Sequence, residues 1–287
     1  MNQWPTLDLE DTVGDVLRKT MRGSRMNVAE LAAATNIAAR SIEAWLADRG
    51  APDADEAARL AAPLGMERRR FQQRAAGAWY PGDLALPLVH RHAQLPHPSN
   101  GYVVRAARDE RVAAIVDPAG RPDVLLALLR AHPLDYSYIL ITHKHDDHCD
   151  AAEAVASAYP DARIVMHEVD APAIGALAAE ALPIRKGERL PFGTRNEIEL
   201  IPTPGHTDGS SCFRIGDLLF TGDTLFAGSV GGCFGDRFGY TDLLANIRRE
   251  LFVLPDATAV LPGHGPPTRI GWERRENPFF TDEEPRH

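Results

Sequence analysis

The sequence predicts an α/β fold preceded by a small all-helical domain. Residues 11–76 have apolar side chains at helical spacing, short breaks that contain glycine or proline, and no strand pattern. From Trp79 onward, short β-branched runs alternate with helical stretches, as in mixed α/β folds. The charge changes at the same point, because residues 1–80 contain 11 basic and 11 acidic side chains and the net charge of −9 arises entirely from the rest.

These patterns define the expected elements in order. Residues 1–78 are predicted to form a helical domain of five short helices. Residues 79–98 are predicted to be a linker with the first strand, and residues 85–287 the α/β domain, which begins within that linker. Its apolar runs predict strands at 102–104, 112–116, 138–141, 163–166, 197–201, 211–215, 218–221 and 259–261, and helices at 122–131, 148–158, 170–180 and 241–253.

The composition indicates a cytoplasmic protein with no membrane partner. Three cysteines form no CxxC pair, which fits a reducing compartment. The first residues lack the pattern of a secretory signal, and no apolar run approaches the roughly 18 residues of a membrane-spanning helix. The negative net charge argues against a chain-wide surface for nucleic acid or anionic lipid.

The stretch ITHKHDDHCD, at 141–150, places three histidines within six positions. His143 and His145 would point about 200° apart on a helix but would share a face on an extended segment. Asp147 and His148 are adjacent, so only a strand that runs into a loop and then a helix can direct all four to one point. Imidazole and carboxylate are the usual ligands of a borderline divalent metal. A solvated surface cluster is the alternative interpretation.

The same arrangement recurs three times further along the chain. His206 follows the strand predicted at 197–201, Asp223 follows the strand at 218–221, and His264 follows the strand at 259–261, each in a turn that contains glycine. In sheet proteins, ligand groups gather at one set of strand ends. These side chains are therefore expected to meet the histidine cluster at one edge of the fold. The stretch VHRHAQLPH lacks this context, so His90, His92 and His97 are predicted to have packing or solvated roles.

The motifs THKHDDH, PGHT, TGDTLF and PGHG resemble the metallo-β-lactamase superfamily, and their order and spacing resemble its glyoxalase II branch in a short form. The resemblance covers about residues 85–281. It implies an αβ/βα sandwich, with two β-sheets face to face and helices outside, and a site for two divalent metal ions. Zinc is the expected metal, with iron or manganese as alternatives. The resemblance implies that one ion binds His143, His145 and His206, that the other binds Asp147, His148 and His264, and that Asp223 bridges both.

The resemblance also implies the reaction. A hydroxide that bridges the two ions would attack the carbonyl of a small-molecule thioester, with Asp147 orienting the hydroxide. In glyoxalase II proteins a basic residue and a tyrosine that bind glutathione stand where this chain has Gly232 and Phe234. The sequence therefore predicts hydrolysis rather than glutathione specificity. A mononuclear iron persulfide dioxygenase is an alternative, although that family usually places an arginine near Gly232.

The helical region contains NVAELAAATNIAARSIEAWLADRG, which resembles a Cro/repressor-type helix-turn-helix. Residues 29–33 would be its first helix, 35–37 its turn and 39–47 its recognition helix, so that Arg40, Ser41 and Glu43 would face a DNA groove. This resemblance implies the alternative of a DNA-binding transcriptional regulator whose metallo-domain processes a ligand. The region has no net charge, which disfavours DNA binding because contacts between basic side chains and phosphates supply much of the affinity for DNA. Homodimerisation, docking against the hydrolase domain and binding of another protein are the other predicted roles.

Overall fold

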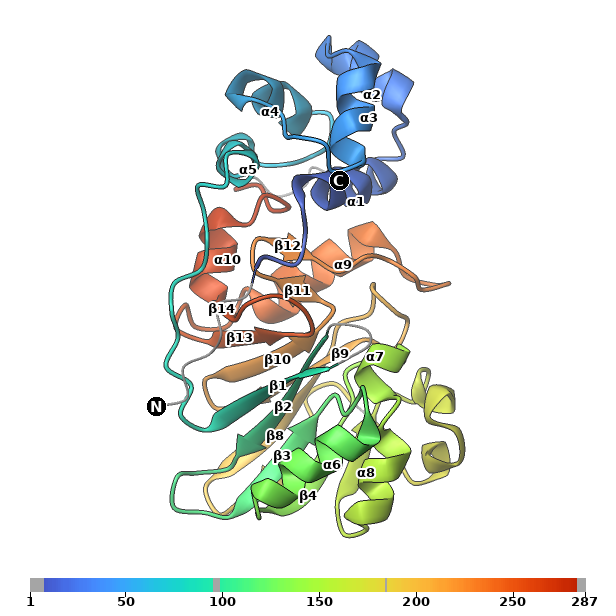
Figure 1. Cartoon of the computed structure of the whole chain (residues 1–287), viewed down its shortest axis with the longest axis vertical. Coiled ribbons are helices and arrows are strands. Elements are labelled where there is room, and N and C mark those ends of the chain that lie inside the picture. The colour runs from blue at the N-terminus through green and yellow to red at the C-terminus, as the bar shows by residue number, and fades with distance from the viewer. Residues whose placement is uncertain (1–7, 95–98, 184, 283–287) are drawn as a thin grey trace.

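The structure, a computed structural model, describes residues 8–94, 99–183 and 185–282 (Figure 1). Two six-stranded sheets pack face to face. The strands of the first sheet, in spatial order, are β1 (Val89–Gln94), β2 (Ser99–Arg105), β3 (Val112–Val116), β4 (Asp135–Leu140), β5 (Arg163–Met166) and β6 (Leu182–Pro183). Those of the second are β14 (Thr268–Arg269), β13 (Ala259–Pro262), β10 (Leu218–Gly222), β9 (Ser211–Ile215), β8 (Asn196–Pro202) and β7 (Arg189–Phe192). A separate pair consists of β11 (Leu225–Phe226) and β12 (Ser229–Val230).

Most of these strands read as continuous apolar runs because both of their faces are buried. On β2, Tyr102 points into the core between the sheets, whereas its neighbour Val103 points toward the outer helices. On β10, Phe220 points into the core between the sheets, and its neighbour Leu219 points to the outer face of the second sheet. Tyr102 and Phe220 meet across the sheets with ring centroids 5.4 Å apart.

Helices cover both outer faces, which gives the expected αβ/βα layers. The first sheet packs against α6 (Pro122–Ala131) and α8 (Ala152–Ala158). The second packs against α9 (Tyr240–Asn246), its continuation η2 (Ile247–Leu251) and α10 (Ile270–Glu276). Among the described residues, no helix combines the length and hydrophobicity that crossing a bilayer requires.

The helical region has the five predicted helices: α1 (Val13–Gly23), α2 (Val28–Thr35), α3 (Ala39–Leu46), α4 (Ala54–Ala61) and α5 (Arg68–Ala75). Three of them begin at reciprocal capping boxes, with Thr12, Asn27 and Asp53 as the N-cap residues. Their apolar faces join the same hydrophobic cluster as the second sheet and its outer helices. Figure 1 shows α1 next to β12 and α9, with α2 and α3 at the end of the molecule away from α6 and α8.

The prediction of one helix at 148–158 is wrong. The structure has a short helix α7 (Asp146–Cys149), a break, and then α8. The Ser99 hydroxyl donates a hydrogen bond to the backbone oxygen of Asp147, at 2.6 Å. In a continuous helix the Ala151 N–H would donate to that oxygen, but it donates to the backbone oxygen of Pro118, at 3.1 Å. These long-range bonds interrupt the helical ladder.

The helix predicted at 170–180 is instead a 3-10 segment, η1 (Ala171–Ala179), broken where Gly175 has a φ of +59°. The helix predicted at 241–253 begins one residue earlier and continues as the wider turn of η2. Helix α10 and the strands β7 and β14 have no counterpart among the predicted elements.

Candidate metal centre

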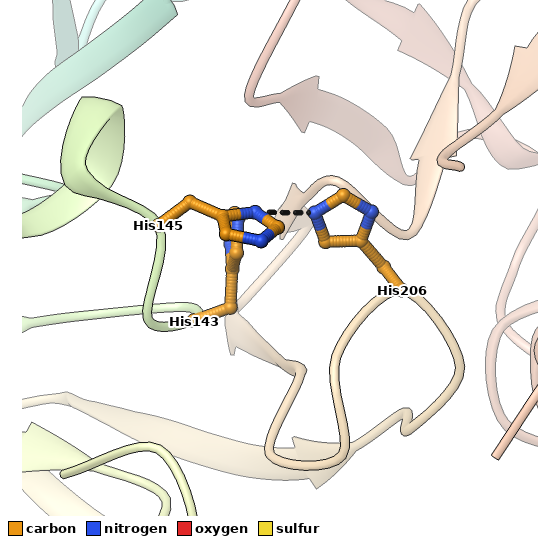
Figure 2. A group of neighbouring side chains, drawn as sticks. All are labelled: His143, His145 and His206. Carbon is orange, nitrogen blue, oxygen red and sulfur yellow. Dashed lines mark hydrogen bonds between the residues drawn. The ribbon is translucent and has the colours of Figure 1, made fainter. Parts of the chain in front are cut away.

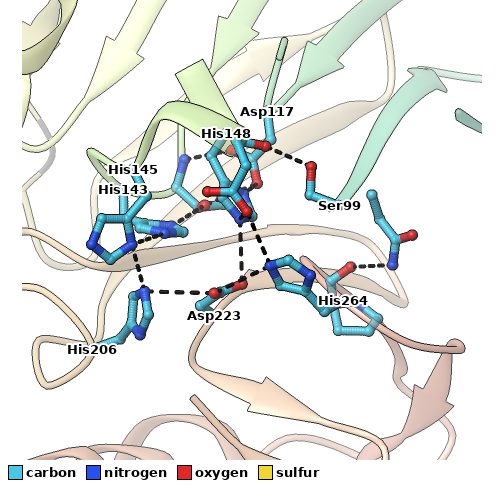
Figure 3. Close-up of polar contacts among 12 residues, drawn as sticks. Ser99, Asp117, His143, His145, His148, His206, Asp223 and His264 are labelled. Atoms are coloured by element: carbon cyan, nitrogen blue, oxygen red, sulfur yellow. Dashed lines mark hydrogen bonds and ion pairs between the residues drawn. The ribbon is translucent and has the colours of Figure 1, made fainter. Parts of the chain in front are cut away.

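The structure brings the seven predicted metal ligands together at one edge of the two sheets (Figure 3). Each lies just beyond the end of a strand, where the chain leaves β4, β8, β10 or β13. The ligands converge because the carboxyl ends of these strands share one edge. The residues are His143, His145, Asp147, His148, His206, Asp223 and His264.

The first group consists of His143, His145 and His206, which point toward one another (Figure 2). Nδ1 of His145 lies 3.0 Å from Nε2 of His143 and 2.9 Å from Nε2 of His206. Burial lowers the pKa of all three imidazoles, well below the ordinary value for His143 and to about 4 for His206. Metal ligation requires neutral imidazole, so these histidines are in the protonation state that a metal needs at neutral pH.

The second group consists of Asp147, His148 and His264, with Asp223 between the two groups. Nε2 of His264 lies 3.3 Å from Asp147 Oδ2 and 3.4 Å from Asp223 Oδ2. The other oxygen of Asp223 lies 3.4 Å from Nε2 of His148, while Oδ2 is also 3.5 Å from Nε2 of His206. One carboxylate therefore reaches imidazoles of both groups.

The donor atoms of this second group fit a cation. Nε2 of His148 and Oδ1 of Asp223 are buried and have no hydrogen-bond partner among the described residues. Buried polar atoms without a partner are uncommon in proteins, and a cation bound among these imidazoles and carboxylates would satisfy both atoms. At Gly263, a Cβ atom would lie 2.3 Å from Asp223 Oδ1 and 2.5 Å from the His148 ring, so only glycine leaves room for both ligands.

Charge distinguishes the second group from the first. Burial alone would lower the pKa of His264, but Asp223, Asp147 and Glu10 outweigh it and raise the pKa to about 11. Asp223, Asp117 and Asp147 likewise raise the pKa of His148 against the effect of burial. Without metal, these two imidazoles therefore hold protons that neutralise the carboxylates, and a bound cation would take the place of those protons.

Comparison with known proteins now places the chain in a family. Residues 95–264 match the family model described as the metallo-beta-lactamase superfamily. The chain belongs to this superfamily. The match begins after the helical region, so α1 to α5 lie outside it.

The matches with curated relatives span most of the length of each relative. An uncharacterised protein of Mycobacterium leprae is 38% identical over 63% of this chain and 93% of that protein. The hydroxyacylglutathione hydrolase GloC of Haemophilus influenzae is 33% identical over 60% of this chain and 89% of that enzyme. The probable polyketide biosynthesis zinc-dependent hydrolase BaeB of Bacillus velezensis is 31% identical, over 66% and 85%.

Solved superfamily structures share the fold. The BLEG-1 B3 metallo-beta-lactamase has a TM-score of 0.59 and 30% identity, over 67% of this chain and 98% of that one. TTHA1623 in a di-iron-bound form has a TM-score of 0.56 and 34% identity, over 67% of this chain and all of that one. The fold thus implies divalent metal ions at this edge, and its members include both zinc and di-iron proteins.

Asp117 is a residue of the site that the sequence reasoning missed. Its carboxylate is buried, lies 2.9 Å from Nδ1 of His148 and accepts hydrogen bonds from the backbone and hydroxyl of Thr142, at 2.8 and 2.9 Å. Such a partner fixes the tautomer and orientation of a ligating histidine. Asp117 follows β3 directly, so the strand-end pattern used for the other ligands could have identified it.

The remaining candidate residues lie elsewhere. Arg40 and Glu43 are exposed on α3 and Ser41 is half-buried there, away from the metal centre (Figure 1). His90 and His92 lie on β1, and His92 is buried. His97 is outside the described residues.

Proposed function

We propose that the protein is a dinuclear-metal hydrolase that cleaves thioesters. The observation that carries the proposal is the pair of adjoining ligand groups, three histidines on one side and a carboxylate with two histidines on the other, with Asp223 between them. The relative GloC, named a hydroxyacylglutathione hydrolase, supports thioester hydrolysis in particular.

In this proposal, His143, His145 and His206 would hold one ion, Asp147, His148 and His264 would hold the other, and the Asp223 carboxylate, which reaches imidazoles of both groups, would serve both. A bound pair of divalent ions supplies an activated water at neutral pH and polarises a carbonyl group. The relatives support zinc or iron, and manganese suits the same nitrogen and oxygen donors. Hydrolysis breaks the C–S bond, places the water oxygen on the acyl carbon and returns a proton to the departing sulfur.

The chain's own residues prepare the site for this reaction. Nδ1 of His206 donates to the backbone oxygen of Gly232 at 2.6 Å, which leaves Nε2 free to face the first group. Asp117 fixes His148 in the same way. The Asp147 carboxylate is partly exposed, and its neighbours His264 and His148 lower its pKa against the effect of burial. It therefore stays ionised at neutral pH and can accept a hydrogen bond from the attacking water.

Metal content measured together with turnover tests the proposal. The purified protein should contain about two ions per chain and should hydrolyse some of a panel of S-lactoylglutathione, other thioesters and lactones without consuming oxygen. Oxygen consumption with persulfides by a protein that contains a single iron would instead establish the dioxygenase alternative. His145→Ala should lose both metal and turnover, whereas replacement of the exposed Lys186 should lose neither.

A further inference from the structure

We propose that helix α1 of the helical region forms a wall of the substrate pocket and that Arg22 and Arg25 recognise an anionic group on the substrate. This inference rests on the proposed function and specifies its substrate class. A cavity of about 650 Å³ lies between α1 and the loop at 231–242. Arg18, Lys19, Arg22 and Arg25 line it on one side, and Cys233 and Phe234 on the other.

The loop that lines the cavity also contacts the first group of metal ligands. The Gly232 backbone oxygen holds Nδ1 of His206, and the Phe234 ring lies 5.4 Å from the His206 ring and 5.7 Å from the His145 ring. Phe234 is 59% exposed, which is unusual for a large apolar side chain. A substrate whose reacting carbonyl lies at the metal centre can therefore pass over Phe234 and extend into the cavity.

Three of the cations that line the cavity form no salt bridge in the described part of the chain: Arg22 and Arg25 on the α1 side, and Arg237 on the loop side, where its guanidinium lies 5.8 Å from the centre of the Phe238 ring. Lys19 donates to the Asp11 carboxylate at 2.7 Å, and Arg18 pairs with Asp15 at 2.6 Å. Arg22 and Arg25 are exposed and form no salt bridge within the described part of the chain. The acidic residues of the cavity wall are Asp15, which pairs with Arg18, the exposed Asp236, and Asp242, which accepts a hydrogen bond from the Gly239 N–H at the start of α9.

The Arg22 guanidinium lies close to the loop, and Arg25 lines the same cavity. Burial raises the pKa of the Cys233 thiol to about 11, and Arg22 and Lys19 act in the opposite direction, as cations near a thiolate would. A guanidinium presents paired N–H donors that match the oxygens of a carboxylate or phosphate. In a chain with a net charge of −9, a group of arginines that form no salt bridge with the described residues and lie beside the proposed site favours an anionic ligand.

The position of α1 is fixed by contacts with the hydrolase region. Lys19 donates to the Val230 backbone oxygen at 2.7 Å, and Asp11 is also hydrogen-bonded to Ser229. At Gly23, the last residue of α1, a Cβ atom would lie 2.3 Å from the Tyr240 ring, so only glycine allows this approach.

The segment that leads into α1 extends this contact to the metal centre. Glu10 lies 3.8 Å from Nδ1 of the predicted metal ligand His264, and its backbone packs against Gly265. One continuous segment therefore borders both the second ligand group and the cavity. This continuity makes the helical region part of the substrate site rather than an appended module.

Three acetyl thioesters test the assignment, because they share the acyl group and differ only in the thiol. Acetyl-coenzyme A has phosphates, S-acetylglutathione has carboxylates, and S-acetyl-N-acetylcysteamine has neither. The full-length, metal-loaded protein should prefer one of the charged thioesters. Arg22→Gln combined with Arg25→Gln should lower the ratio of charged to neutral kcat/KM by at least about tenfold, mainly through KM, as expected for the loss of charge-assisted hydrogen bonds.

Arg49→Gln is the matched control, since Arg49 is an exposed arginine of the same region that does not line the cavity. An unchanged ratio in the double variant, or a wild-type protein with no preference for charged thioesters, would overturn the inference. Calorimetric binding of coenzyme A and glutathione separates this outcome from failure of the proposed function. Thiol binding that depends on Arg22 and Arg25 supports the inference even if no thioester is hydrolysed, and absence of binding by the wild-type protein refutes it.

Discussion

Replacing Asp117 with asparagine should weaken metal binding at the second ligand group while leaving the fold intact. The carboxylate of Asp117 can only accept hydrogen bonds, so Nδ1 of His148, 2.9 Å away, must hold the proton. That tautomer leaves the lone pair of Nε2 facing Asp223 and the metal centre. An asparagine can keep the bond from the Thr142 N–H, but its amide group then meets Nδ1 as a second donor. Moving the imidazole proton to Nε2 relieves this conflict and blocks ligation.

The magnitude follows from the burial of this contact. Asp117 is 1% exposed, so water cannot replace the lost acceptor. A hydrogen bond to a charged group contributes roughly 1.5–3 kcal/mol, and loss of the partner of a ligating histidine typically costs about 10- to 100-fold in metal affinity. The two estimates agree. We expect zinc to bind the second group about 10- to 100-fold more weakly in Asp117→Asn, with the first group unaffected.

Competition for zinc against a chelator of known affinity, with metal content per chain, measures this effect. Asp150→Asn is the control, because the Asp150 carboxylate accepts a hydrogen bond from the Gly120 N–H at 2.7 Å and contacts no imidazole in the described structure. Circular dichroism confirms that both variants are folded. An Asp117→Asn protein that retains two ions with wild-type affinity would refute the reasoning about the tautomer.

Four further predictions concern the same protein. Asp223→Ala should lower metal stoichiometry and turnover together, and full metal loading in that variant would exclude a bridging role. Metal titration of the metal-free protein at pH 7 should release protons from the second group, because His264 has a pKa of about 11 there; calorimetry in buffers of different ionisation enthalpy measures the release. Burial raises the pKa of Glu273 from 4.5 to about 7, so the free energy of unfolding should fall by about 3 kcal/mol as pH rises through this window. Glu273→Gln should remove that slope in denaturant titrations at several pH values. If the helical region binds DNA, Arg40→Ala should weaken a gel shift that the wild-type protein produces, whereas no shift with any duplex would exclude the regulator alternative.

The sequence predicted the main features of the site because their signals are local. Each predicted ligand comes shortly after an apolar run, and His206, Asp223 and His264 each lie in a glycine-containing turn that follows such a run. Thr12, Asn27 and Asp53 likewise begin three of the five predicted helices through contacts with the third residue beyond. Patterns of this kind depend on backbone sterics and on hydrogen bonds between near neighbours, which the sequence displays without knowledge of the fold.

Only the tertiary structure decided which distant residues serve the site. Asp117 meets His148 across 31 positions, and Arg22 faces a loop that begins more than two hundred positions later. The break between α7 and α8 has the same origin, since the Ser99 hydroxyl donates to the Asp147 backbone oxygen, which would accept a helical hydrogen bond in a continuous helix. Such contacts are set by how the sheets and helices bury their apolar faces against one another, and no local pattern encodes that packing.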